Sequence, residues 1–147
     1  MRTKFPRGIV SNQTTGNIGL FFVCYKLSQY GWNVMPTARN AKGVDIVAYS
    51  QNGARVRLIQ VKTLSNRDPV GLGKRLDDLI AEWMIIYVKF CRKEQRCFVL
   101  RTSEVKKLAV NLGENERASW WLSPKRYDTD AYEGDKGGWG RIGQGVP

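Results

Sequence analysis

Two strand-like segments joined by a short polar turn constrain the fold of this chain more than any other feature. Residues 44–49 read VDIVAY, residues 55–62 read RVRLIQVK, and turn-forming residues 50–53 lie between them. Segments of this length that are rich in Val and Ile, separated by such a turn, predict an antiparallel hairpin. Gly43 stands directly before the first strand, where it lets the backbone approach a neighbour closely.

The segments around the hairpin predict an α/β sandwich built on one mixed sheet. In chain order we expect a helix over 14–30, an extended run at 32–36, the hairpin, a loop at 64–73, one or two helical turns within 74–81, strands at 83–90 and 97–100, a helix from 102 or 103 to 111, and a strand at 119–122. The 147 residues fit one domain, which we expect over residues 1–123. Residues 124–147 are rich in Asp, Gly, Lys and Tyr and predict a loosely ordered C-terminal arm.

Positive charge is concentrated in the N-terminal part of the chain. The sequence has 24 Lys and Arg against 13 Asp and Glu, a formal net charge of +11. Residues 1–62 hold nine basic residues and one acidic residue, whereas residues 124–147 hold four of each. An asymmetric basic surface is typical of proteins that bind the phosphate backbone of a nucleic acid, and a generic basic protein is the alternative.

The chain has no histidine and three scattered cysteines, Cys24, Cys91 and Cys97. The absence of histidine excludes Ser-His-Asp and Cys-His triads, His-ligated zinc and a histidine general base. Three cysteines are too few for a four-cysteine zinc site, so we expect reduced thiols in or near a core. The N-terminal residues contain no apolar signal region. The longest apolar stretches are far shorter than the ~20 residues needed to span a bilayer. We therefore expect a soluble, cytoplasmic protein without membrane contact.

Asp45 is the sole carboxylate in the first 67 residues. It is either the partner of a nearby Arg or Lys, or a carboxylate that holds a cation or a proton beside a polyanion. Side chains alternate between the two faces of a strand, so Gln60 and Lys62 share a face and the odd-numbered residues of that strand take the other. Asp45, Gln60 and Lys62 can therefore converge at one edge of the sheet. Phosphodiester hydrolysis uses such a set, in which oxygen ligands hold Mg²⁺ and a lysine orients water or stabilises the phosphate.

The segments G-V-D-I-V and L-I-Q-V-K-T resemble the motif of the PD-(D/E)XK nuclease superfamily. That motif has an Asp on one strand, then Glu or Asp, any residue and Lys on the next, and Asp45, Gln60 and Lys62 take these places. The Gln-x-Lys variant is similar to that of Mrr-like nucleases. The resemblance covers residues 14–110. It implies the restriction-endonuclease-like fold, an α/β/α sandwich with a central mixed sheet and an αβββαβ core.

The resemblance also implies the roles of the motif residues. Asp45, Gln60 and the Val61 carbonyl are expected to hold Mg²⁺, for which Mn²⁺ can substitute, and Lys62 is expected to orient the attacking water. Val44 replaces the proline of the motif, a common variation. Gln60 replaces an acid, so its amide oxygen can ligate a hard cation but contributes no charge to binding.

A second carboxylate is missing from the expected place. Many members of the superfamily carry a Glu on the first helix, and the matching face of this chain offers only Asn17 or Gln13. The remaining candidates lie beyond the Gln-Val-Lys strand and are Asp68, Asp77 and Asp78.

Four further residues are candidates for contact with nucleic acid, namely Arg39, Lys42, Thr63 and Arg67. The first two lie in the polar loop before Asp45, Thr63 follows Lys62, and Arg67 lies in the loop over 64–73. The alternatives are a solvated turn, a structural threonine and a plain connection. In the first predicted helix, Gly16 and Gly19 are expected to allow close packing against the sheet.

These observations predict a metal-dependent endonuclease that hydrolyses phosphodiester bonds in duplex or branched DNA. A homodimer is expected, because one site cuts one strand and a symmetric pair can cut both. The first alternative is a DNA-binding module with the nuclease fold and a weak or inactive site. The second is a subunit whose basic surface contacts RNA or an acidic protein.

Overall fold

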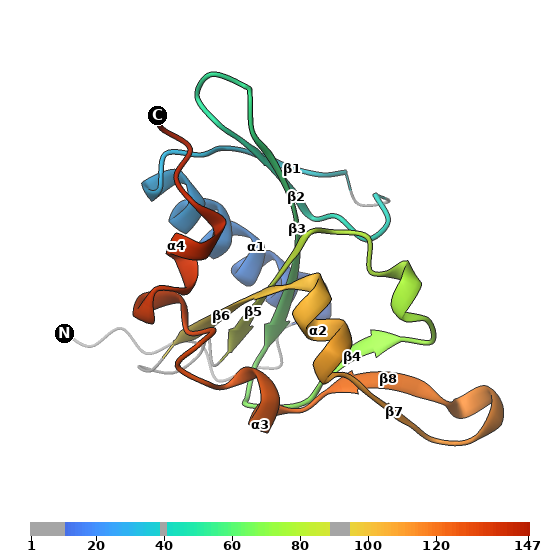
Figure 1. Ribbon diagram of the computed structural model, residues 1–147. Coiled ribbons are helices and arrows are strands. Elements are labelled where there is room, and N and C mark those ends of the chain that lie inside the picture. The colour runs from blue at the N-terminus through green and yellow to red at the C-terminus, as the bar shows by residue number, and fades with distance from the viewer. Residues whose placement is uncertain (1–10, 39–40, 89–94) are drawn as a thin grey trace.

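A five-stranded mixed sheet forms the centre of the molecule (Figure 1). The computed structural model describes residues 11–38, 41–88 and 95–147. In spatial order the sheet consists of β1 (Asn33–Pro36), β2 (Ile46–Tyr49), β3 (Val56–Leu64), β5 (Trp83–Val88) and β6 (Arg96–Arg101). The pair β3–β5 is parallel and the other neighbours are antiparallel. The predicted hairpin is β2–β3, in which Ile46 lies opposite Ile59 and Tyr49 opposite Val56.

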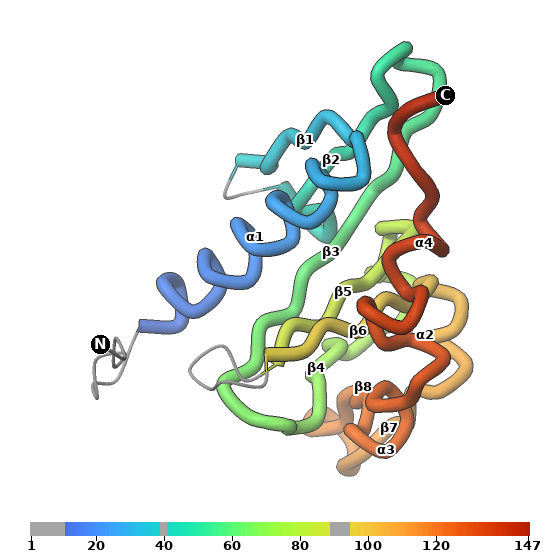
Figure 2. Tube along the Cα trace, turned by 90° about the vertical axis from the view of Figure 1, so that its left-hand side faces the viewer, coloured from blue at the N-terminus to red at the C-terminus, as the bar shows by residue number. Residues whose placement is uncertain are grey.

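Two helices cover one face of this sheet. They are α1 (Asn12–Gln29) and α4 (Gly138–Ile142). The Ser11 side chain caps α1 by accepting a hydrogen bond from the Thr14 N–H at 3.2 Å. Figure 2 shows α1 running along β3, away from α2, α3 and the small sheet. The side chains buried between these helices and the sheet include Val23, Leu27, Ile46, Ile59, Ile85, Trp139 and Ile142.

The opposite face carries a second layer with its own core. Its elements are α2 (Thr102–Leu108), α3 (Pro124–Tyr127) and a three-stranded antiparallel sheet in the order β4 (Val70–Gly73), β8 (Ser119–Leu122), β7 (Val110–Leu112). Short 3₁₀ turns occur at η1 (Leu76–Asp78), η2 (Asn115–Arg117) and η3 (Gly134–Lys136). Met84 and Ile86 of β5 face this side, where they pack in one cluster with Leu72, Leu100 and Leu122. Helices therefore lie on both faces of the sheet, and the predicted α/β/α sandwich is confirmed.

Two predicted elements differ from the structure. The segment 64–73 is not all loop, because Val70–Gly73 forms β4 and pairs with β8. The helix expected to reach residue 111 ends at Leu108, and Val110–Leu112 forms β7 instead. Both strands pair with Ser119–Leu122, which is distant in sequence, so their formation depends on tertiary contacts.

The segment 124–147, predicted to be a loosely ordered arm, is folded onto the body in the structure. Tyr127, Trp139 and Ile142 are all buried. Close to the C-terminus, the Gly145 N–H donates to the Tyr30 carbonyl at 2.9 Å. Composition alone underestimated this segment, because a few large apolar side chains hold it in place among many polar ones.

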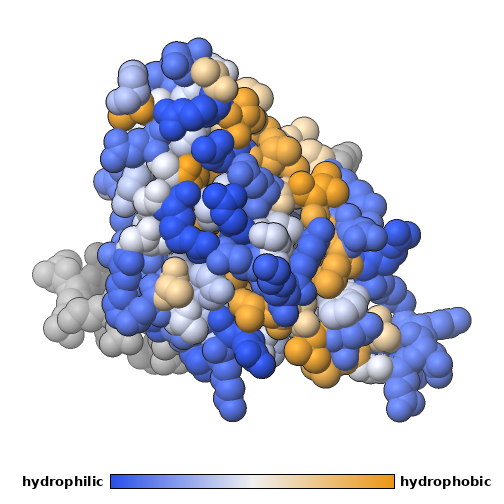
Figure 3. Space-filling model, in the orientation of Figure 1, coloured by the Kyte–Doolittle hydropathy of each residue, from blue (hydrophilic) through white to orange (hydrophobic). Residues whose placement is uncertain are grey.

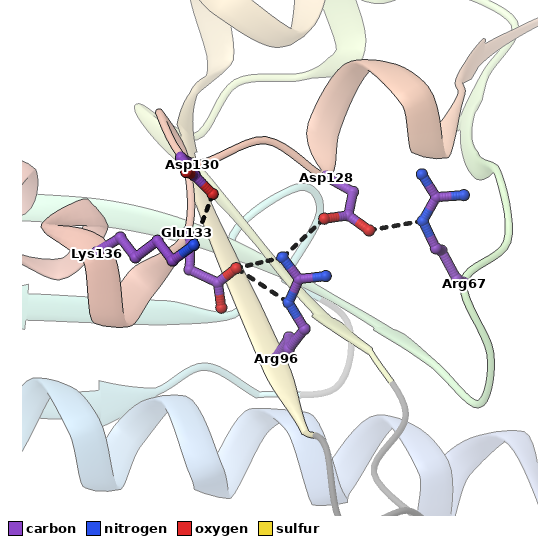
Figure 4. Close-up of polar contacts among 6 residues, drawn as sticks. All are labelled: Arg67, Arg96, Asp128, Asp130, Glu133 and Lys136. Carbon is purple, nitrogen blue, oxygen red and sulfur yellow. Dashed lines mark hydrogen bonds and ion pairs between the residues drawn. The ribbon is translucent and has the colours of Figure 1, made fainter.

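Charged residues of the same segment fasten it to the sheet (Figure 4). The Asp128 carboxylate accepts from Arg67 Nε at 2.6 Å and pairs with Arg96 Nη2 at 2.8 Å. Arg96 also donates to Glu133 from Nε at 3.0 Å and from Nη2. Hydrogen bonding to Glu133 is the main cause that raises the pKa of Arg96.

The predicted close packing of α1 on the sheet occurs at Gly19. A Cβ atom placed on Gly19 would lie 1.8 Å from Thr63 Oγ1, and that hydroxyl is buried without a hydrogen-bond partner. A Cβ on Gly16 would meet nothing within 4 Å, so close packing does not explain Gly16. Gly19 therefore sets the distance between α1 and β3.

We expect Gly19→Ala to lower the free energy of unfolding by about 1–3 kcal/mol, because the added methyl group overpacks the contact with Thr63. Gly16→Ala is the matched control in the same helix and should be neutral or stabilising by up to about 1 kcal/mol. Urea denaturation of both variants measures this. Adding Thr63→Ala to Gly19→Ala should restore part of the loss, and equal effects of the two glycine substitutions would contradict the packing argument.

Candidate active site

The register of the β2–β3 hairpin determines where the motif residues lie. The paired register ends where Ile46 lies opposite Ile59, which directly precedes Gln60 on β3. The Asp45 N–H donates to the Ile59 carbonyl at 2.8 Å, which holds the start of β2 on β3. Gln60 and Lys62 lie beside Met84 and Ile86 of β5, on the face of the sheet away from α1. Asp45 instead lines a cavity together with Val61 and residues of α1. Convergence of the three side chains at this edge of the sheet stays a prediction.

A hydrogen bond fixes the Asp45 carboxylate between the two strands. The Val61 N–H donates to Asp45 Oδ2 at 2.7 Å. Thr37, directly after β1, supports the same point by donating its hydroxyl to the Val44 carbonyl at 2.6 Å and its N–H to the Asp45 carbonyl at 2.9 Å. The ion pairs of the described residues do not include Asp45. Asp45 is therefore held by backbone and is not the partner of a basic side chain there.

A cavity of about 390 Å³ opens beside Asp45. Its walls come from α1, from the connection between β1 and β2, and from β3. The lining residues are Gln13, Gly16, Asn17, Leu20, Thr37, Ala38, Ala41, Asp45 and Val61. Gln13 and Asn17 of α1 therefore line the same cavity as Asp45, and so does Gly16.

Lys62 is in a partly desolvated position near Asp45. Burial lowers the pKa of the Lys62 ammonium, and attraction by the Asp45 carboxylate opposes this shift only in part. A lysine whose charged form is penalised in this way exchanges a proton more readily than an exposed one.

Asp45 is the one carboxylate among the described residues that line the cavity. Asp68, Asp77 and Asp78 do not line the cavity. The backbone carbonyl oxygen of Asp78 lies 3.4 Å from the position of a Cβ on Gly43, in the connection that precedes β2. Within the described ranges, no group of three or more His, Cys, Asp and Glu side chains could hold a metal ion. Neutral oxygens must therefore complete any ligand set around Asp45.

The four candidates for nucleic-acid contact are in different situations. Lys42 is exposed in the loop before Asp45, and Arg39 lies outside the described residues. Thr63 is packed under Gly19, and Arg67 is engaged by Asp128. The Thr63 hydroxyl is thus buried against α1, and a phosphate would have to compete with Asp128 for Arg67. Sequence analysis did not assign a role to Thr37, because its contacts with residues 44 and 45 arise only when β1 pairs with β2.

Comparison with known proteins supports the fold. The chain is similar to a bacterial homing endonuclease, I-Ssp6803I, with a TM-score of 0.60, 15% identity, and coverage of 90% of this chain and 93% of that one. It is also similar to Hjc, a Holliday junction resolvase of Archaeoglobus fulgidus, with a TM-score of 0.50, 19% identity, and coverage of 77% and 87%. No family model and no curated protein matches the sequence.

The predicted fold is confirmed by these likenesses: the chain has the restriction-endonuclease-like fold of the PD-(D/E)XK nucleases. In one respect the order of elements differs from the expected αβββαβ core. The connection between β3 and β5 contains β4 and the 3₁₀ turn η1 where the motif predicts a helix. Across the described part of the chain, no helix is long and apolar enough to cross a membrane.

We expect Lys62 to titrate below the usual lysine pKa of 10.5, and Lys136 to titrate above it, because hydrogen bonding to Asp130 raises the pKa of Lys136. NMR of the side-chain resonances measures both in one sample. Asp45→Asn should lower the pKa of Lys62 further, since it removes the opposing attraction. In the unfolded chain Lys62 binds its proton more tightly than in the folded protein, so the charged form of Lys62 lowers the free energy of unfolding. This loss of stability is fully present at pH values below the folded-state pKa of Lys62, and it is relieved as the pH rises through that pKa. A Lys62 pKa equal to or above that of Lys136 would contradict the burial argument.

Proposed function

We propose that this protein is a metal-dependent DNA endonuclease. The observation that carries the proposal is the Asp45 carboxylate, which accepts a hydrogen bond from the Val61 N–H at 2.7 Å, between Gln60 and Lys62 in the sequence of β3. The same carboxylate attracts the Lys62 ammonium. The structural neighbours are a homing endonuclease and a Holliday junction resolvase, which supports DNA as the substrate. We infer duplex or branched DNA, and the net charge of +11 favours binding of its backbone.

The oxygen donors around Asp45 suit a hard divalent cation. Asp45 supplies one carboxylate, Gln60 supplies an amide oxygen, and Val61 supplies a carbonyl. In a β-strand, the N–H and C=O of one residue point toward the same neighbouring strand. The Val61 N–H donates to Asp45, so the Val61 carbonyl points toward the same side of β3. Carboxylate, amide and carbonyl oxygens are the ligands of Mg²⁺ and Mn²⁺. When bound, such an ion polarises a phosphate and lowers the pKa of bound water.

The roles of the side chains follow from their positions. Asp45 holds the negative charge of the site between the strands. Lys62 donates a hydrogen bond to the attacking water or to a phosphate oxygen, and its low pKa lets it take part in the proton movement. Lys42, exposed in the loop beside the cavity, contacts the phosphate backbone. Cys24 and Cys97 are free and buried, which favours a reducing compartment, and we place the protein in the cytoplasm.

One observation favours a second function. The single carboxylate at the site provides less charge for a cation than two would, which favours a DNA-binding module that does not cut. Such a module would keep salt-dependent DNA binding without any metal-dependent cleavage. The two functions differ in one measurable step, hydrolysis.

Cleavage of supercoiled plasmid and of a branched DNA, in Mg²⁺ and in Mn²⁺, tests the proposal. Asp45→Asn and Lys62→Ala should each lower the cleavage rate about a hundredfold or more. Asparagine keeps an acceptor for the Val61 N–H, so Asp45→Asn removes charge while preserving the hydrogen bond. Asp130→Asn and Lys136→Ala, an ion pair of the C-terminal segment, are matched controls that should cut normally. DNA binding without cleavage by wild type would instead support the binding module.

The neutral Gln60 generates a gain-of-function prediction. Gln60→Glu adds a carboxylate on the strand beside Asp45 and should lower the Mg²⁺ concentration for half-maximal cleavage by about an order of magnitude, because metal affinity rises with ligand charge. Titration of Mg²⁺ at fixed DNA measures this. Gln13→Glu is the comparison variant, because it places the second acid on α1, at the wall of the cavity, instead of on β3. An unchanged or weaker Mg²⁺ dependence in Gln60→Glu would show that Gln60 is not a ligand.

A further inference from the structure

The side of α1 that borders the cavity beside Asp45 is formed by four residues, namely Gln13, Gly16, Asn17 and Leu20. Their spacing of i, i+3, i+4 and i+7 places them on one face of the helix. We call these four residues the α1 wall. Three of them are an amide, a glycine and a second amide, so the α1 wall is mainly polar and small.

Gly16 has no packing role within the protein. It is exposed, and a Cβ at this position would meet nothing within 4 Å, whereas a Cβ on Gly19, three residues later, would collide with Thr63. A glycine inside a helix costs stability relative to alanine. Glycine is suited to places where a ligand approaches the backbone closely. The bare backbone at Gly16 therefore indicates that a ligand packs against the α1 wall.

The charges around the cavity favour an uncharged ligand at this wall. Among the described residues that line the cavity, none is a lysine or an arginine, and Asp45 is an acid. A phosphate held against the α1 wall would thus lack a basic partner. Basic residues lie on other elements, such as Lys106 and Lys107 of α2, where Figure 3 shows strongly hydrophilic surface.

The polar groups of the α1 wall are available to a ligand. Gln13 and Asn17 are exposed, and neither side chain forms a hydrogen bond within the part of the chain that the structure describes. Each amide offers both donors and an acceptor, which is how Asn and Gln recognise the edge of a base. Leu20, Ala38 and Ala41 add apolar surface for the face of a planar ring. The cavity volume of about 390 Å³ is near the lower end for small-ligand sites.

We propose that this cavity receives one nucleobase of the bound DNA, which Gln13 and Asn17 bind by hydrogen bonds and which packs against Gly16. The inference rests on the proposed function, because it takes DNA as the ligand. Asp45 lines the same cavity, so the base belongs to a nucleotide close to the cleaved bond. A base that is paired and stacked in a duplex cannot enter the cavity, and leaving the stack costs least for a base that is already unpaired. DNA with an unpaired nucleotide is therefore the preferred substrate class.

The test is the affinity of the wild-type chain for DNA duplexes of one sequence, measured by fluorescence anisotropy without divalent metal. One duplex is fully paired, four carry a single unpaired nucleotide with each of the four bases, and one carries an abasic nucleotide at the unpaired position. The unpaired and abasic duplexes share their phosphates and their kink, so their comparison isolates the base. We expect the preferred base to bind about tenfold more tightly than the abasic nucleotide, as for one bidentate pair between an amide and a base.

Two substitutions in the α1 wall should lower this ratio to about threefold or less. Gly16→Ala fills the bare backbone position, and Asn17→Ala removes an amide. Gly140→Ala is the matched control, because Gly140 is an exposed glycine of α4 at which a Cβ would also meet nothing within 4 Å. This control should keep the wild-type ratio. Alanine favours a helix more than glycine does, so Gly16→Ala should melt no lower than wild type, and thermal melting checks this.

Equal affinity of the wild-type chain for the abasic duplex and for all four unpaired bases would overturn the proposal. A base preference that survives in Gly16→Ala or in Asn17→Ala would also overturn it, because the base would then bind outside the α1 wall. The same holds if Gly140→Ala loses the preference. Plasmid cleavage in Mg²⁺ separates this inference from the proposed function: cleavage without base preference refutes only the inference, whereas base preference without cleavage refutes only the endonuclease.

Discussion

The hydrogen bond from the Val61 N–H to the Asp45 carboxylate is the interaction on which the site depends. Two antiparallel strands that separate leave backbone N–H and C=O groups without their ladder partners, and each such group must find another. Here a carboxylate takes the place of the missing backbone acceptor. The same contact satisfies the backbone of β3 and holds a negative charge in a defined position beside the cavity. Removing the acceptor would therefore disturb both the strand and the site.

The distance between α1 and β3 determines the other wall of the cavity. Gly19 allows the helix to contact Thr63 directly, at a separation that no other residue at position 19 would permit without a shift. Gln13 and Asn17 lie nearer the start of the same helix and line the cavity with Asp45. A packing contact within the core thus sets how far the amide groups of the helix stand from the carboxylate.

The sequence analysis predicted the parts of this structure that depend on local patterns. The β2–β3 hairpin and the shared face of Gln60 and Lys62 follow from strand alternation across a short turn. Three parts required tertiary information. The alternation in β4 is hidden because Gly71 and Gly73 occupy its exposed positions, and β7 forms only by pairing with β8. The C-terminal segment is fixed by a few anchors, such as Trp139, that contact elements distant in sequence.

The strand β3 combines these constraints in one segment. Its odd-numbered residues face α1 and α4, where Ile59 is fully buried and Arg57 lies over Trp32. Its even-numbered residues begin with exposed Val56 and Leu58 and continue to Gln60 and Lys62. Packing on the inner face fixes the register, and the register decides which side chains appear on the outer face. Because the side-chain period is two, a slip of one residue would move Lys62 to the inner face and Arg57 to the outer one. Burial of Ile59 therefore maintains both the site and the apolar surface beside it.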